Sequence, residues 1–181
     1  MITEDLLALA TRVEKEMDAS LAAVFEAHRQ MLNDPLLKKE LQAEIQGNLV
    51  SAGSAVKTVF RRWERRFLKM ESRMSQQKGS DMRDISNRLS NALAGIHIHP
   101  LEQIAPGCVL VTAVLLASDT VFLSKCSAAA VLLGHGHTGS HAALFLRSMG
   151  IPCMQHVVPC SDSLHWMRAW QKSPKRTRCR T

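Results

Sequence analysis

Apolar residues recur at steps of three or four along the first half of the chain, and this helical period ends near Pro100. The first stripe covers residues 6–31, which predicts one long amphipathic helix if nothing interrupts it, a length suited to a helical hairpin. Further stripes cover residues 36–49, 56–70 and 85–93. The pattern predicts a bundle of four helices over residues 1–95, with its large apolar side chains in the core.

Helix ends are marked by capping residues and glycines. Asn33, Asp34 and Pro35 form a stop and restart, because a capping side chain is followed by a proline suited to a first helical turn. We expect a break around Gly53 and a second one at residues 78–80. The last helix of the bundle is expected to end at Gly95.

The pattern after Pro100 is that of an α/β unit. Residues 108–111 and 128–133 are β-prone, and Ser118 and Asp119 between them are good capping residues for a helix. The order strand, helix, strand, loop and helix predicts a partial α/β domain over residues 96–158. The chain is therefore expected to be α+β, with a basic, disordered tail at 159–181. We also expect the helical part to be the more stable, because the sheet would expose an edge.

Composition excludes several classes of protein. The net charge of +7 suggests nucleic-acid binding, but six basic residues without an acid lie in the last 14 positions, and the rest carries only +1. No apolar run approaches the roughly 18 residues of a membrane span, and no secretion signal is present, so we expect a cytoplasmic protein. Five cysteines without a CxxC pair indicate reduced thiols.

A Gly-rich turn leads into a helix-forming run within residues 134–152. Ser140 and His141 stand at the junction, so His141 is expected at or near a helix N-terminus. Unpaired backbone N–H groups favour an anion there, and a neutral imidazole can attack phosphorus. By itself, a Ser-His pair at a helix start is also an ordinary capping arrangement.

This stretch resembles the phosphohistidine signature GGxTSHxAIxARxxGIP of phosphoenolpyruvate-utilising enzymes. The resemblance implies that His141 is the phosphorylated residue and that Thr138, Gly139 and Ser140 orient its ring or donate hydrogen bonds. Arg147 offers charge nearby or is a plain surface arginine. Two positions depart from the signature: His137 replaces a glycine, and Gly139 stands where threonine is usual.

Two helical segments, FEAHRQMLNDPLL and DMRDISNRLSNALAG, resemble the helical subdomain of enzyme I of the bacterial phosphotransferase system. That subdomain docks the small phosphocarrier protein HPr. The resemblance implies carrier-binding residues at Gln30, Met31, Leu37 and Lys78, where Lys78 replaces a family arginine. His28 also matches a family position. On an apolar helix face it is expected to be a core residue without a catalytic role.

The resemblance implies a two-step relay, from phosphoenolpyruvate to the histidine and then to a carrier such as HPr. In the family a β/α barrel binds phosphoenolpyruvate and magnesium, and these 181 residues contain no such sequence. We therefore expect no cofactor in this chain and a separate phosphoenolpyruvate-binding domain. Two alternatives stay open: an inactive helical binding module, and a metal site of His135, His137 and His141 with His156 or Cys153.

Overall fold

The computed structural model describes residues 2–16, 19–96, 99–136 and 138–157, and it shows the expected α+β fold. The predicted disordered tail, Met17 and His137 lie outside these residues. Of the helices described, none is long and apolar enough to cross a membrane. The helices are α1 (Ile2–Glu16), α2 (Ala19–Asn33), α3 (Pro35–Asn48), α4 (Ala52–Leu68), α5 (Arg73–Leu93), a 3-10 turn η1 (Pro100–Gln103), α6 (Ala117–Cys126) and α7 (His141–Ser148); the strands are β1 (Val109–Thr112), β2 (Ala130–Leu133) and β3 (Cys153–Met154).

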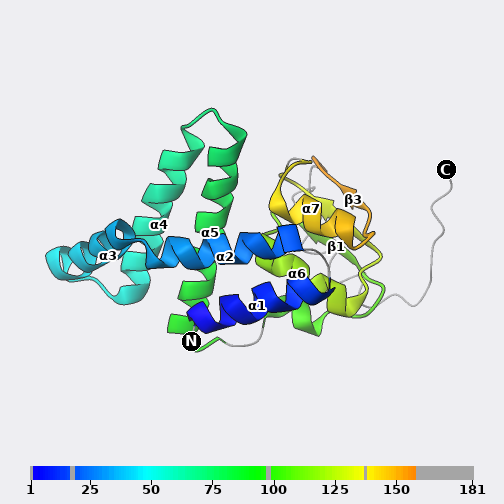
Figure 1. Ribbon diagram of the computed structural model, residues 1–181, viewed down its shortest axis with the longest axis horizontal. Coiled ribbons are helices and arrows are strands. Elements are labelled where there is room, and N and C mark those ends of the chain that lie inside the picture. The colour runs from blue at the N-terminus through cyan, green and yellow to red at the C-terminus, as the bar shows by residue number, and fades with distance from the viewer. Residues whose placement is uncertain (1, 17–18, 97–98, 137, 158–181) are drawn as a thin grey trace.

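The first apolar stripe forms two helices rather than one, so the prediction of a single long helix was wrong. Helices α1 and α2 lie side by side, and α2 runs from beside α7 past α5 to α3 (Figure 1). Leu6 and Val13 of α1 share a buried cluster with Val24 and Phe25 of α2. A hairpin buries the two halves of the stripe against each other, which one straight helix cannot do.

The boundary of α3 follows the predicted capping chemistry. Oδ1 of Asp34 accepts hydrogen bonds from the backbone N–H groups of Leu36 and Leu37, at 2.7 and 3.1 Å, and Pro35 occupies the first turn. Helix α4 begins one residue after its cap Ser51, so Gly53 lies inside the first turn and is not the break itself. The expected end at Gly95 is confirmed, since α5 closes at residue 93 and Gly95 has a φ of 69°.

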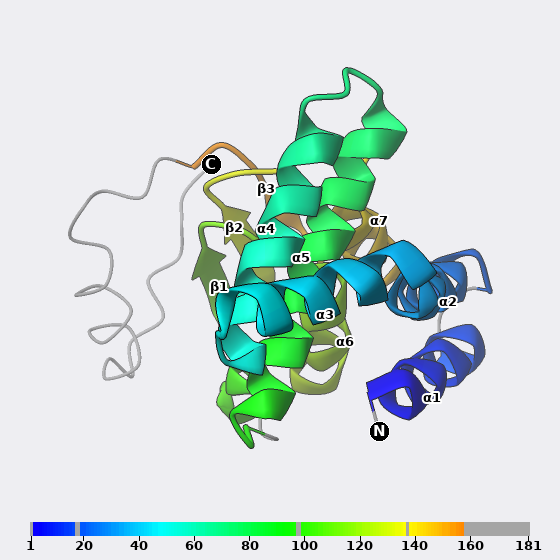
Figure 2. The ribbon, with the colours of Figure 1, turned by 90° about the vertical axis from the view of Figure 1, so that its left-hand side faces the viewer.

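Helix α5 runs without interruption through residues 78–80, so the predicted break there was wrong. Gly79 faces α4, and a Cβ atom at this position would lie 3.2 Å from Cδ2 of Leu68. The two helices lie side by side as a hairpin (Figure 2). Gly79 therefore permits a close helix–helix contact, and neighbouring packing outweighs its low helix propensity.

The α/β unit contains a three-stranded parallel sheet in the order β1, β2, β3. Helix α6 connects β1 to β2, and α7 connects β2 to β3, as expected for parallel neighbours. Leu123 of α6 and Leu146 of α7 pack in one buried cluster with Val131 of the central strand. Strand β3 was not predicted, because a two-residue strand carries no recognisable period.

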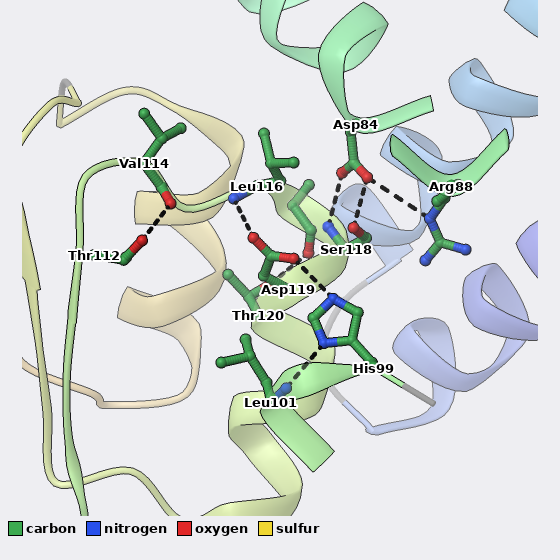
Figure 3. A network of polar contacts seen from close by, with 11 residues as sticks. Asp84, Arg88, His99, Leu101, Thr112, Val114, Leu116, Ser118, Asp119 and Thr120 are labelled. Carbon is green, nitrogen blue, oxygen red and sulfur yellow. Dashed lines mark hydrogen bonds and ion pairs between the residues drawn. The ribbon is translucent and has the colours of Figure 1, made fainter. Parts of the chain in front are cut away.

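Polar contacts join the helical part to the α/β unit at the start of α6 (Figure 3). The Asp84 carboxylate of α5 accepts hydrogen bonds from the Ser118 backbone N–H at 2.9 Å and its hydroxyl at 2.5 Å. Asp119 accepts from the Leu116 N–H at 2.9 Å and lies 3.1 Å from Nε2 of His99. The two predicted capping residues thus have different partners: Asp119 closes its own turn, and Ser118 binds α5.

An apolar cluster spans the same junction, since Phe25 of α2, Val121 of α6 and Phe145 of α7 are buried together. The rings of Phe25 and Phe145 have centroids 5.7 Å apart. The two parts therefore share a core. The domain boundaries and the greater stability of the helical part stay predictions.

Replacing Phe25 with alanine should destabilise the whole chain, because the ring is fully buried where the two parts meet. We expect a loss of about 3–5 kcal/mol in the free energy of unfolding, measured by urea denaturation. Leu7→Ala is the control, since Leu7 of α1 is 53% exposed. Equal losses in the two variants would contradict the shared core.

Candidate functional site

His141 is the first residue of α7 and follows the loop that leaves the carboxyl end of β2. In parallel α/β sheets, functional residues gather beyond this end of the strands. Ser140 is the N-cap, and its hydroxyl accepts a hydrogen bond from the Ala143 N–H at 3.2 Å. The expected position of His141 at a helix N-terminus is confirmed.

The loop before His141 is held through two of its carbonyl oxygens. Nε2 of Gln77, on α5, donates to the Gly139 carbonyl at 2.6 Å. Nη2 of Arg147 donates to the Thr138 carbonyl at 2.9 Å, so this guanidinium braces the loop from within α7. The Thr138 side chain is exposed. The loop is thus fixed by one residue of the α/β unit and one of the helical part.

The imidazole of His141 contacts a carboxylate from the other part of the molecule. Nδ1 of His141 lies 3.0 Å from Oδ1 of Asp81, which is on α5 and only 5% exposed. The His141 side chain itself is 23% exposed. Among the described residues, no hydrogen bond engages its Nε2, so this nitrogen is the one available to a partner or substrate.

A second imidazole approaches the same oxygen atom. Nε2 of His28, on α2, lies 3.2 Å from Oδ1 of Asp81, but neither ring nitrogen of His28 has a well-aligned hydrogen bond within the described chain. We treat this contact as electrostatic, since distance alone does not make a hydrogen bond. His28 is fully buried and packs edge-on against Phe25. The expected core location of His28 is confirmed, but it also borders the site.

Two opposing effects set the ionisation of Asp81. Burial by itself raises the pKa of this carboxyl, because it disfavours the charged form. The hydrogen bond with His141, together with the electrostatic attraction of His141 and His28, outweighs burial and brings the pKa below the ordinary value of 3.8. Asp81 is therefore an anion near neutral pH.

The four residues expected to bind a carrier have different environments. Lys78 is exposed on α5, three residues before Asp81, with its Nζ 6.0 Å from the centroid of the Phe67 ring. Gln30 is exposed on α2, and Met31 is partly buried. Leu37 is only 1% exposed and packs in the core between α3, α4 and α5, so we correct its assignment: its side chain does not lie on a docking surface.

A hollow of about 520 Å³ lies beside α7, but His141 does not line it. Its walls include Thr138, Arg147 and Gln155. Within the described residues there is no group of three or more His, Cys, Asp or Glu side chains able to hold a metal ion. Nδ1 of His141 already contacts Asp81 on α5. The imidazole of His141 is therefore positioned by α5 and not by the walls of the hollow.

Sequence reasoning gave no role to the residues of α5 that contact the α/β unit. Their spacing was nevertheless a signal, because a polar stripe on an amphipathic helix needs a polar neighbour or solvent. The stripe follows steps of four and three along one face and consists of Gln77, Asp81 and Asp84, and it is continued four residues on by Arg88, which pairs with Asp84.

With this site and fold on one chain, comparison with known families is unambiguous: the chain belongs to the PEP-utilising enzymes. The N-terminal region of these enzymes matches residues 2–78, and their mobile domain matches residues 104–166. The second match contains His141 and its loop.

Within that class, the chain is similar to phosphoenolpyruvate-protein phosphotransferases, which confirms the resemblance to enzyme I. The protein of Mycoplasma genitalium is 30% identical over 151 residues, covering 83% of this chain and 26% of that protein. The protein of Mycoplasma capricolum subsp. capricolum is 31% identical over 140 residues, covering 77% and 24%. The chain spans about a quarter of the length of these relatives.

Two solved structures show the same fold. A solution structure of enzyme I has a TM-score of 0.66 and 25% sequence identity, with 87% of this chain and 63% of that chain covered. An N-terminal domain of the nitrogen enzyme 1 has a TM-score of 0.55 and 26% identity, with 85% and 64% covered. The order of helical bundle and partial α/β domain is thus shared with enzyme I.

The lowered pKa of Asp81 predicts how acid affects stability. The folded state favours the ionised carboxylate, so the resulting stabilisation is complete above the unfolded pKa and is lost as pH falls through the folded pKa. The difference in unfolding free energy between the native chain and Asp81→Asn should persist down to about pH 4 and shrink below it. Urea unfolding across this range measures it, and a difference that grows in acid would contradict the assignment.

Proposed function

We propose that this chain is the phosphohistidine-bearing part of an enzyme I-type phosphotransferase. In this proposal Nε2 of His141 accepts a phosphoryl group and exchanges it with a histidine of an HPr-like carrier protein. The observation that carries the proposal is the geometry of His141, whose Nδ1 contacts Asp81 while its Nε2 has no protein partner among the described residues. The family membership supports the same chemistry.

The helix start supports the proposal electrostatically. The first backbone N–H groups of a helix have no carbonyl partner within the helix. In α7 one of these groups, the Ala143 N–H, is bound by the hydroxyl of the N-cap Ser140. Together with the helix dipole, they favour the negative charge of a phosphoryl group carried by the first residue. Phosphoryl transfer depends mainly on positioning and on stabilising charge on the phosphoryl oxygens, and this location contributes to both.

The carrier is proposed to dock on exposed residues of α2 and α5, the helices that bear His28 and Asp81. We define this docking surface as Gln30, Met74 and Lys78, because Met74 and Lys78 occupy successive turns of α5 just before Asp81. Met74 is 68% exposed, so its flexible side chain is free to contact a carrier. A lysine supplies a point charge for an incoming phosphoryl group, without the planar fork of an arginine.

The phosphoenolpyruvate step is proposed to need a separate domain that binds phosphoenolpyruvate with magnesium. The family models that match this chain describe the N-terminal region and the mobile domain of these enzymes. A cytoplasmic location fits this chemistry, since the phosphocarrier and phosphoenolpyruvate are soluble. An inactive binding module is the second candidate, and it requires that His141 take no phosphate.

Incubation with phosphorylated HPr, followed by mass spectrometry, tests the phosphoryl transfer. We expect an acid-labile phosphate on His141 and none on His141→Ala, because the alanine variant lacks the nucleophile. His135→Ala is the control, since His135 is exposed and follows the same strand. Label that persists in His141→Ala would overturn the site, and no label on the native chain would favour the binding module.

Reversing the charge of Lys78 should slow transfer from the carrier. We expect a several-fold lower rate for Lys78→Glu in low salt, and a smaller effect in high salt, because an exposed charge acts mainly on association. Lys57→Glu is the matched control, since Lys57 borders a separate groove with Arg83 and Asn87. Rates measured by quenched flow that fall equally in both variants would exclude a docking role for Lys78.

A further inference from the structure

The hollow beside α7 reaches the carboxyl ends of two neighbouring strands. Thr138 follows β2, and Gln155 and His156 follow β3, while Ala143 and Arg147 belong to α7. Its volume of about 520 Å³ is in the range of small-molecule sites. In parallel α/β sheets, ligands bind in crevices outside this end of the strands. The size and the location of the hollow are therefore those of a ligand site.

The walls of the hollow carry a permanent positive charge, the Arg147 guanidinium. None of the described residues that line the hollow is an Asp or Glu. Among the described residues, no carboxylate pairs with Arg147 either. Burial raises the pKa of the Cys153 thiol, which is another wall residue, so this group is uncharged near neutral pH. The hollow therefore favours a ligand with a negative charge.

Arg147 keeps hydrogen-bond donors for such a ligand. Its Nη2 donates to the Thr138 carbonyl at 2.9 Å, but a guanidinium has five N–H groups in a planar fork. A carboxylate matches this fork, because it accepts two parallel hydrogen bonds. A phosphate group carries close to two negative charges near neutral pH, which a single guanidinium does not balance. The charge of the wall thus suits a carboxylate better than a phosphate.

The remaining wall suits an apolar body. Ala143 is 6% exposed, and Ile151 and Pro152 adjoin it along the hollow. The Gln155 amide adds a polar group from the end of β3. It packs against Gly136, where a Cβ atom would lie 3.9 Å from Nε2 of Gln155. Apolar walls with a few well-placed polar groups are the usual composition of a small-molecule site.

We propose that this hollow binds a small organic carboxylate, with its charge on Arg147 and its apolar body against Ile151, and that binding stabilises the loop before α7. Arg147 is the link, because the same guanidinium holds the Thr138 carbonyl of that loop. A ligand that holds the guanidinium lowers the entropic cost of this contact. His141 does not line the hollow, so the site is separate from the proposed phosphoryl transfer and does not depend on it.

The basic end of the chain is a poor alternative occupant. Residues 168–181 contain six Lys or Arg residues and no Asp or Glu. Like charges oppose a contact between this segment and Arg147. An organic anion meets no such opposition.

Binding is tested by ¹⁹F NMR of the full chain with 4-fluorobenzoate, which joins a carboxylate to a compact apolar ring. We expect a dissociation constant of about 1 mM or lower, with shifts of the Ile151 and Gln155 amide signals in ¹H–¹⁵N spectra. The neutral probe 4-fluorobenzamide should bind at least about 10-fold more weakly, because hydrogen bonds to a charged group are stronger. Inorganic phosphate at equal concentration should not displace 4-fluorobenzoate.

Two variants change the charge of the hollow in different ways. Arg147→Gln removes the guanidinium and should weaken binding about 10- to 100-fold. Because this variant also alters the contact with Thr138, Gln155→Glu is the second variant: it keeps Arg147 and adds a negative charge on another wall. We expect binding at least about 10-fold weaker. Arg61→Gln is the matched control, since Arg61 is exposed on α4 and borders a separate groove, and it should bind the probe as the native chain does.

Amide hydrogen exchange tests the link to the loop. We expect exchange at Gly139 and Ser140 to slow several-fold when the native chain is saturated with 4-fluorobenzoate. Arg147→Gln should show no such slowing, because it lacks the group that joins ligand and loop. Unchanged exchange in the saturated native chain refutes this link.

The remaining outcomes decide the site itself. Equal affinities for the acid and the amide, or equal losses in Arg147→Gln and Arg61→Gln, refute a carboxylate site. Stronger binding of phosphate than of 4-fluorobenzoate overturns the choice of ligand class. Absence of binding, or signal shifts confined to residues outside 138–156, refutes the hollow as the place of binding. No phosphoryl donor is used, so a failure here and a failure of the proposed function are distinguishable.

Discussion

Two buried carboxylates on one face of α5 hold the α/β unit against the helical part. Asp81 contacts the first residue of α7, and Asp84 accepts two hydrogen bonds from Ser118 in the first turn of α6. Both acids thus meet a helix N-terminus, where unpaired N–H groups and the helix dipole favour negative charge. A displacement of either helix along α5 would take a hydrogen-bond partner away from a buried carboxylate, so these contacts favour one register of the two parts.

Apolar packing and the polar contacts have separate roles at this junction. The cluster around Phe25 and Phe145 supplies most of the attraction, because burial of aromatic surface is favourable and has little directional preference. By contrast, Gln77 and Asp81 each meet one particular group, the Gly139 carbonyl and an imidazole nitrogen. The packing therefore brings the two parts together, and the polar stripe decides where His141 lies.

The sequence alone predicts what depends on local chemistry. The cap at Asp34 and the helix start at His141 were both predicted, because a capping side chain acts within three residues. The role of Gly79 and the absence of Leu37 from the exposed surface of α3 were not, since each depends on a helix distant in sequence. Asp81 was missed for the same reason: its partner lies 60 residues away, and only the polar stripe on α5 signals that such a partner exists.

The location of Asp81 has a consequence for the proposed role of His141 as a nucleophile. His141 belongs to the α/β unit, but the group that orients its ring belongs to the helix that also bears Lys78 and Met74 of the proposed docking surface. A carrier that binds there contacts the element that holds the reactive imidazole. Since a displacement near 1 Å can slow a transfer about a hundredfold, a small shift of α5 on binding would reach His141 through Asp81 and its loop through Gln77. In the proposed function, docking and reactivity are thus linked through α5, and this link requires that the two parts remain packed together.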